Sequence, residues 1–332
     1  MAASKRVLVE MVLLLLLVIL MSCAADGAAR GADDASEKAA LRLWAAAFPS
    51  TPLPAVLRAR LPSLHGAAAA QFLQEAKQGI LSPQSCNVAK VLCRIDTALV
   101  SVVNSRHTGR GPKAQVNEYV HEKQLYKGSE IMMPDLNDDN LVASFLPDSI
   151  SKQIPYGTQE LRSLLHMFQY HSETNMSKNI IMSLNECEAK SLADQKWVCA
   201  RSLNDLVAFV RSSVGSDAEL VWSNDATFSN KKVQVIDVQL KYAGHGKPPV
   251  SCHNFAFPHA LFYCHYIQGT KVYHVTLKDT ASGITKSRIA ICHALHSITT
   301  TMLPANMSPN EQDCHWIYGS HLMWVPKAQI ST

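Results

Sequence analysis

The stretch CHNFAFPHALFYCH, residues 252–265, begins and ends with a Cys-His pair. Two more pairs follow, Cys292-His293 and Cys314-His315, and the intervals between successive pairs contain 10, 26 and 20 residues. We call these dipeptides the Cys-His pairs. Cysteine forms crosslinks in an oxidising compartment, and the neutral imidazole of histidine is a common metal ligand. The last third of the chain can therefore hold the fold together, bind a metal ion, or do both.

Two of the segments that carry the pairs have the composition of β-strands. Residues 260–267 and 288–293 are rich in aromatic and β-branched side chains. Adjacent side chains of a strand point to opposite faces, so the thiol and the imidazole of one pair must diverge. Two such strands side by side can gather their cysteines on one face and their histidines on the other. This hypothesis requires some of the paired cysteines to have Cα atoms within about 7 Å of each other.

Three interpretations of the Cys-His pairs stay open on spacing alone. In the first, disulfides accompany a site for Cu(II), Zn or Ni made of His253, His265, His293 and His315. In the second, the cysteines are structural and the histidines are only polar neighbours. In the third, Cys and His ligate zinc together, which the lack of Cys-x-x-Cys spacing disfavours. Other histidines of the same region that can complete a second site or support the first are His259, His274, His296 and His321.

The N-terminus predicts the compartment. Lys5 and Arg6 precede an apolar run that ends near Met21, and small residues follow at 22–25. This is the pattern of a secretory signal peptide that is cut near Ala24 or Ala25. An uncleaved membrane anchor is the alternative, but the run is short for a span of ~20 residues. We therefore expect a secreted chain that has no membrane segment after cleavage.

Cysteine usage and glycosylation sequons fit the secretory pathway. Cleavage would remove Cys23 and leave an even number of cysteines, which predicts disulfides of undetermined connectivity. The sequons at Asn175 and Asn306 predict N-glycosylation. The disulfide candidates are Cys86, Cys93, Cys187, Cys199, Cys252, Cys264, Cys292 and Cys314.

Composition excludes some function classes. The 332 residues are 47% hydrophobic and 17% charged, as in ordinary globular proteins, and the formal net charge is +4. No Lys/Arg-rich stripe is present, so nucleic-acid binding has no electrostatic support. The sequence also lacks Gly-x-Ser-x-Gly, His-Glu-x-x-His and a phosphate-cradling glycine loop.

The N-terminal part is predicted to be irregular and helical. Residues 25–40 are small and polar, which favours disorder. The prolines of 49–54 forbid a continuous helix, whereas 65–76 is helix-prone. Residues 104–123 have the composition of a linker. We therefore divide the chain into a signal peptide (1–24), a variable N-terminal region with a linker (25–123) and a main domain (124–330).

The main domain is predicted to be α+β, with short helices before an antiparallel β core. Apolar spacing predicts helices over 159–170 and from Leu203, the latter capped by Ser202. Residues 232–240 predict a strand with a bulge at Val235-Ile236. Short turns between the later strands favour antiparallel pairing. In detail, we expect a hairpin of 260–267 with 271–278, a strand at 288–293 and a strand pair within 314–327.

These residues resemble the BURP-domain proteins of plants, whose C-terminus carries four Cys-His pairs. The third interval, 20 residues, is shorter here than in the family pattern. The Cys86/Cys93 pair is not part of that pattern either. Sequence that supports the resemblance includes FPHALFY at 257–263, KVY at 271–273, His321 with WVPK at 324–327, Cys187, Cys199 with RSL at 201–203, and Trp44 with TPLP at 51–54.

The resemblance implies a secreted protein of the apoplast or cell wall, or of the vacuole, that acts in development or stress response without turnover. Cell-wall components are its implied partners. The alternative is a copper-dependent enzyme that oxidatively cyclises a peptide substrate, with His253, His265, His293 and His315 as copper ligands. A third, weaker alternative is a partner of wall enzymes related to the polygalacturonase-associated branch. That branch carries long aromatic-glycine repeats, which this chain lacks.

Overall fold

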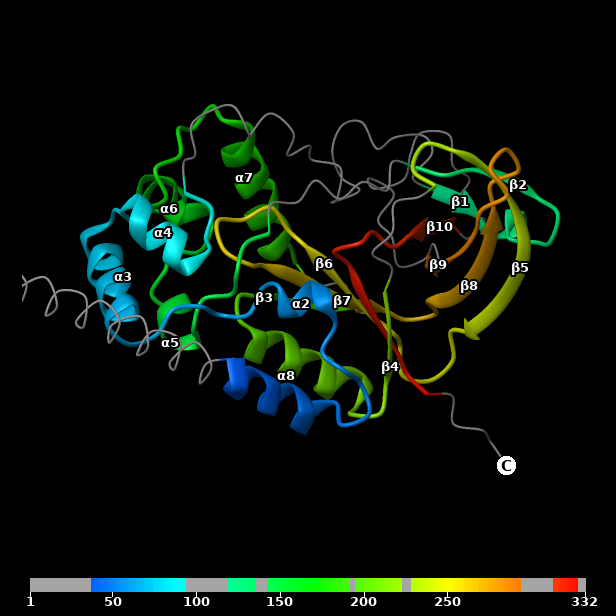
Figure 1. The fold of residues 1–332 in the computed structure, drawn as a ribbon, viewed down its shortest axis with the longest axis horizontal. Helices are drawn as coiled ribbons and strands as arrows, with labels where there is room; N and C mark the ends of the chain where they lie inside the picture. Colours follow the sequence, from blue (N-terminus) through cyan, green and yellow to red (C-terminus); the bar gives the residue numbers. More distant parts are fainter. Residues whose placement is uncertain are drawn as a thin grey trace, which may run out of the picture.

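The computed structural model describes residues 37–93, 119–134, 142–190, 195–222, 228–293 and 313–327. Most helices gather at one end of the molecule, and the strands form two antiparallel sheets (Figure 1). This arrangement confirms the predicted α+β class. Among the described helices, none has the length and apolar character of a membrane span. The predicted signal peptide, residues 1–24, lies outside the described residues.

The helices are short. Residues 37–47 are helical, and the other helical elements are α2 (Ala55–Arg58), α3 (Gly66–Gln78), α4 (Pro83–Ala89), η2 (Glu122–Gln124), α5 (Asp148–Ser151), η3 (Thr158–Glu160), α6 (Leu161–Met167), α7 (Asn175–Cys187) and α8 (Leu203–Val214). The strands are β1 (Tyr119–His121), β2 (Glu130–Met132), β3 (Gln195–Ala200), β4 (Glu219–Val221), β5 (Lys232–Tyr242), β6 (Val250–Asn254), β7 (Phe262–Ile267), β8 (Lys271–Lys278), β9 (Thr285–His293), β10 (Asp313–Trp316) and β11 (Leu322–Val325).

The strands divide into two sheets where the sequence suggested a single core. The six-stranded sheet has the order β1-β10-β9-β8-β5-β2, and the five-stranded sheet has the order β3-β7-β6-β11-β4. Every neighbouring pair is antiparallel, as predicted. The Cys-His pairs are shared between the sheets, two in β6 and β7 and two in β9 and β10.

Two predicted strand pairings are wrong. β7 and β8 do not form a hairpin, because β7 pairs with β3 and β6 whereas β8 pairs with β5 and β9. β10 and β11 likewise lie in different sheets. The physical reason is burial: the Phe262, Tyr263 and Cys264 side chains are all buried, so β7 is covered on both faces and occupies an interior position in its sheet. A short turn fixes where a strand ends, but packing selects its partner.

Other local predictions are confirmed. The register of β5 against β8 shifts between Val235 and Asp237, at the predicted bulge. The Ser202 side chain accepts a hydrogen bond from Asp205 N and caps α8. Residues 119–123, expected within the linker, instead form β1 and the start of η2. Residues 37–40, expected in the disordered leader, are helical.

A cluster that we call the inter-sheet core joins the two sheets. Ile289 and Ile291 belong to the six-stranded sheet, whereas Met323 and Val325 belong to the five-stranded sheet. Ile289, Ile291 and His293 alternate with Ala290 and Cys292 along β9, so His293 extends the face that carries this core. The full cluster of buried side chains is Tyr242, Val272, Ile289, Ile291, Ile317, Met323 and Val325.

The crossover from β7 to β8 leads to a first prediction. Gly244 has φ +85°, and a Cβ added there would lie 2.9 Å from the backbone oxygen of Gly269 in this crossover. Gly246 has a similar φ of +84°, but its nearest neighbour would be the Tyr242 hydroxyl at 3.9 Å. Gly244→Ala should therefore destabilise the fold by about 1–3 kcal/mol more than Gly246→Ala. Urea unfolding followed by tryptophan fluorescence measures both, and equal losses would show that the close approach does not matter.

Candidate functional site

Each pair of neighbouring Cys-His strands forms one disulfide rung. In β6 and β7, Cys252 lies directly opposite Cys264, and the two are bonded with a Cα–Cα distance of 4.0 Å. In β9 and β10, Cys292 lies opposite Cys314, bonded at 3.9 Å. All these cysteines are fully buried. Their sulfurs are therefore not free thiolates, which excludes the interpretation of a shared Cys/His zinc site.

The register then brings the histidines together. His253 lies opposite Tyr263, so His265 is its diagonal neighbour across the strand pair. His315 lies opposite Ile291, so His293 is its diagonal neighbour. Diagonal neighbours lie within reach of aromatic side chains, and all these histidines point away from the disulfide faces. One short motif thus crosslinks one face of a strand pair and places two imidazoles on the other.

The imidazoles of both sheets meet in what we call the histidine cluster: His253, His265, His293 and His315. The Nε2 atoms of His253 and His265 lie 3.0 Å apart, and those of His293 and His315 lie 3.2 Å apart. Between the sheets, the ring centroids of His253 and His315 are 6.1 Å apart, and those of His265 and His293 are also 6.1 Å apart. His315 reaches the cluster despite the shortened third interval.

The pairwise geometry fits a metal ion. Two imidazole nitrogens bound at about 2.0–2.1 Å to one ion are separated by about 3 Å. Among the described residues, however, no group of three or more His, Cys, Asp or Glu side chains surrounds one point as a ready-made metal site. The nitrogen distances within each pair nonetheless suit shared coordination, because the two imidazole pairs would need only side-chain rotation to share an ion. The cluster thus consists of two imidazole pairs that lie next to each other.

Burial keeps part of the cluster neutral. Burial and the neighbouring imidazoles of His315 and His253 hold the pKa of His293 well below its ordinary value. Burial also lowers the pKa of His315. A neutral imidazole offers a lone pair to a metal ion, whereas a protonated ring cannot. Both rings are thus in the form that binds metal at neutral pH.

Residues outside the Cys-His pairs support the cluster. The Nδ1 atom of His321 lies 3.2 Å from Nδ1 of His253, which makes His321 a fifth member of the network. Thr270 Oγ1 lies 2.9 Å from Nδ1 of His293. His321 was predicted as a supporting histidine, whereas no sequence pattern predicted Thr270. A lone threonine in a turn gives no signal that it faces an imidazole.

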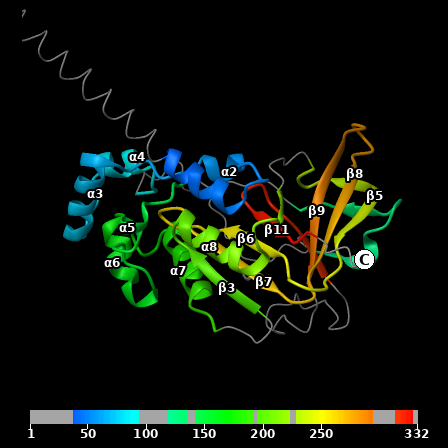
Figure 2. The ribbon, with the colours of Figure 1, turned by 90° about the horizontal axis from the view of Figure 1, so that it is seen from below.

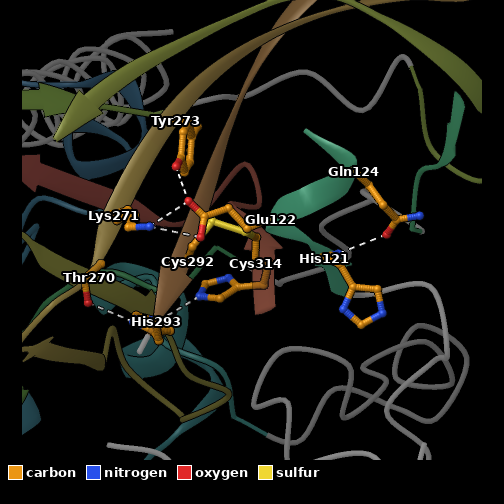
Figure 3. Close-up of a disulfide and its surroundings, with 10 residues drawn as sticks. His121, Glu122, Gln124, Thr270, Lys271, Tyr273, Cys292, His293 and Cys314 are labelled. Atoms are coloured by element: carbon orange, nitrogen blue, oxygen red, sulfur yellow. Dashed lines mark hydrogen bonds and ion pairs between the residues drawn. A yellow bond between two sulfur atoms is a disulfide. The ribbon is translucent and has the colours of Figure 1, made fainter. Parts of the chain in front are cut away.

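On the face of the six-stranded sheet that carries the Cys292–Cys314 disulfide, opposite to the histidine face, lies a charged group that we call the clasp: Glu122, Lys271 and Tyr273 (Figure 3). The Glu122 carboxylate accepts hydrogen bonds from Lys271 Nζ at 2.9 and 3.1 Å and from the Tyr273 hydroxyl. Burial, followed by the hydrogen bond to Glu122, raises the pKa of Tyr273. The clasp ties η2 to β8, and β1 just before η2 pairs with β10. These residues had no local sequence signature, because their contacts span about half of the chain.

The remaining candidates lie elsewhere. The structure pairs Cys86 with Cys93 and Cys187 with Cys199. Asn175 is exposed at the start of α7, while its sequon partner Ser177 is buried. His274 lies on β8 and His259 lies beside Phe257, both apart from the four imidazoles. His296 and Asn306 lie outside the described residues.

His259 gives a prediction about pH dependence. It is 1% exposed, and burial lowers its pKa to about 4. Its folded pKa is below the unfolded value of ~6.5, so this contribution to stability is present above pH ~6.5 and is lost as the pH falls toward ~4. At about pH 4.5 the loss should be about 2–3 kcal/mol. His259→Asn should reduce the drop in unfolding free energy between about pH 7 and 4.5 by that amount. If the variant lost as much unfolding free energy between these pH values as the wild type, the lowered pKa of His259 would not be the cause of the acid sensitivity.

Comparison with known protein families matches residues 118–326 to the BURP domain. The chain belongs to the BURP domain family. The match begins at residue 118, so it includes β1 and the start of η2, which precede the boundary expected at residue 124. The division into three segments otherwise remains a prediction.

The BURP relatives are plant proteins. The chain is 28% identical over 217 residues to the tomato (Solanum lycopersicum) protein named polygalacturonase-1 non-catalytic subunit beta, an alignment that covers 63% of this chain and 34% of the relative. It is 29% identical over 214 residues to polygalacturonase 1 beta-like protein 1 of Arabidopsis thaliana, with 63% and 34% coverage. It is 25% identical over 270 residues to BURP domain-containing protein 16 of rice (Oryza sativa subsp. japonica), with 74% and 77% coverage. The chain thus spans about a third of the polygalacturonase-related proteins.

Proposed function

We propose that this chain is a secreted, disulfide-locked BURP protein of the plant cell wall that acts without turnover, by binding a wall polysaccharide or a polysaccharide-degrading enzyme. The observation that carries the proposal is its similarity to the tomato protein named as a non-catalytic polygalacturonase subunit. The four disulfides fit an oxidising extracellular compartment. The sequence contains none of the hydrolase motifs considered above.

Binding assays test this proposal. The full chain is produced by secretion, and its association with purified polygalacturonase and with polygalacturonate is measured by biolayer interferometry. We expect saturable binding to at least one of them and no hydrolysis of polygalacturonate by the chain alone. The matched control is the same chain after reduction and alkylation, which should lose binding. Hydrolysis by the chain itself, or the absence of binding to both ligands, would overturn the proposal.

The histidine cluster supports a second candidate function, a copper-dependent oxidative peptide cyclase. Copper bound there would supply one-electron oxidation chemistry. The residues that would hold it are His253, His265, His293 and His315, and Tyr263 lies next to them with its ring centroid 5.1 Å from that of His265. Trp44 is a poor internal substrate because it is only 2% exposed. Tyr126, at 60% exposure, is accessible.

Copper loading separates the two candidates. After loading and exposure to oxygen, mass spectrometry is used to search peptides of the chain, and added Trp- or Tyr-containing peptides, for the loss of two hydrogens. Such a loss would establish the cyclase, and its absence with copper bound would argue against it. His253→Ala combined with His265→Ala should lower copper stoichiometry, whereas the exposed His171→Ala should leave it unchanged. Unchanged stoichiometry in the double variant would exclude the histidine cluster as the copper site.

A further inference from the structure

Thr270 lies where the chain crosses from one sheet to the other, between β7 and β8. Its side chain is 1% exposed. Its Oγ1 atom donates to the Ile267 carbonyl oxygen at 2.8 Å and lies 2.9 Å from Nδ1 of His293. Figure 3 shows Thr270 and His293 joined in this way. One buried hydroxyl therefore contacts both the crossover backbone and a member of the histidine cluster.

The protons in this arrangement can be assigned. A hydroxyl group has one hydrogen, and a carbonyl oxygen can only accept, so the Thr270 hydrogen is committed to Ile267. Thr270 Oγ1 must then accept a hydrogen bond from His293, which places the imidazole proton on Nδ1. A neutral imidazole carries only one such proton. Nε2 of His293 is therefore an unprotonated acceptor that faces Nε2 of His315.

We propose that Thr270 is a positioning residue that locks His293 in the Nδ1–H tautomer and aims its Nε2 lone pair into the histidine cluster. Hydrogen bonds of this kind fix the orientation of metal-bound histidines and raise their basicity. The turn that contains Thr270 begins directly after β7, which carries His265. The same residue thus links His293 of the six-stranded sheet to the end of the strand that carries His265. An effect of Thr270 on metal affinity depends on the proposed metal site. The tautomer of His293 does not depend on it.

The tautomer can be observed without any metal. Two-bond nitrogen–hydrogen NMR spectra of 15N-histidine-labelled protein distinguish Nδ1–H from Nε2–H rings, and His293→Gln identifies the His293 signal. We expect the Nδ1–H tautomer in the wild type and in Thr270→Ser, which keeps the hydroxyl. Thr270→Val keeps the shape and removes the acceptor, so its His293 should shift toward Nε2–H. An Nε2–H ring in the wild type, or an unchanged ring in Thr270→Val, would overturn the inference.

Zinc titration then tests the positioning role. Calorimetry with Zn²⁺, a diamagnetic probe for imidazole sites, should show about 10–100-fold weaker binding in Thr270→Val and near-wild-type binding in Thr270→Ser. Thermal unfolding shows whether Thr270→Val is folded. If it is not, the His293 tautomers of the wild type and of Thr270→Ser still test the inference. Equal affinities despite a changed tautomer would overturn the positioning role. A wild type that binds neither zinc nor copper would refute the metal site, and the NMR result would then stand alone as the test of the tautomer.

Discussion

Replacing both Cys252 and Cys264 with serine should lower the free energy of unfolding by about 4–5 kcal/mol and weaken zinc binding at the proposed histidine site at least ~10-fold. Loss of the crosslink alone accounts for about 3 kcal/mol, because it frees a closed loop of the unfolded chain. Two fully buried hydroxyl groups would replace the disulfide, and each costs free energy if it lacks a good partner. Metal affinity would fall because the rung no longer fixes the register that brings His253 to His265.

The Cys187–Cys199 disulfide supplies a matched control for this prediction. It has the same sequence separation of 12 residues as Cys252–Cys264, but it is half-buried and carries no cluster histidine. Its double serine variant should lose about 3 kcal/mol and keep its metal affinity. Urea unfolding and zinc calorimetry measure both variants. If both double variants lost the same stability and both kept the zinc affinity of the wild type, the Cys252–Cys264 disulfide would stabilise the fold only by constraining the unfolded chain.

Trp44→Ala should destabilise the protein by about 3–5 kcal/mol, even though Trp44 lies outside the segment matched to the BURP family. The side chain is 2% exposed, and its ring centroid lies 4.8 Å from that of Phe48 and 6.4 Å from that of Trp324 in β11. Its Nε1 donates to Thr51 O at 2.8 Å. Figure 2 shows the helix at residues 37–47 and α2 on the side of β11. Removal of this indole therefore leaves a cavity in the buried cluster that contains Trp44, Phe48 and Trp324.

The control for this prediction is Trp222→Ala, which removes the same side chain at 37% exposure. Its effect should stay below about 1 kcal/mol, as for most surface positions. Circular dichroism during urea unfolding compares the two variants. If Trp44→Ala were as mild as Trp222→Ala, residues 37–93 would be an accessory arm. A large difference would show that the folded unit extends well before residue 118.

Local features were predictable because they depend on neighbouring residues. The cap at Ser202 and the bulge near Val235 arise from short-range hydrogen bonding and side-chain alternation, so the sequence signals both. Strand partners were not predictable in the same way. The β7–β8 turn is short enough for a hairpin, yet buried side chains on both faces of β7 direct it to β3 and β6. Contacts such as Glu122 with Lys271 join segments far apart in the chain and have no local signature.

The dipeptide Cys-His determined by itself that a thiol and an imidazole would point to opposite faces of any strand that contains them. It also fixed that each disulfide between facing strands would leave two histidines as diagonal neighbours. Only the tertiary structure decided that the pairs would divide between two sheets, and that the histidine faces of those sheets would meet. The physical reason is that alternation is a property of one strand, whereas the meeting of two faces depends on which apolar surfaces pack together. The inter-sheet core makes that choice and brings His293 and His315 beside His253 and His265.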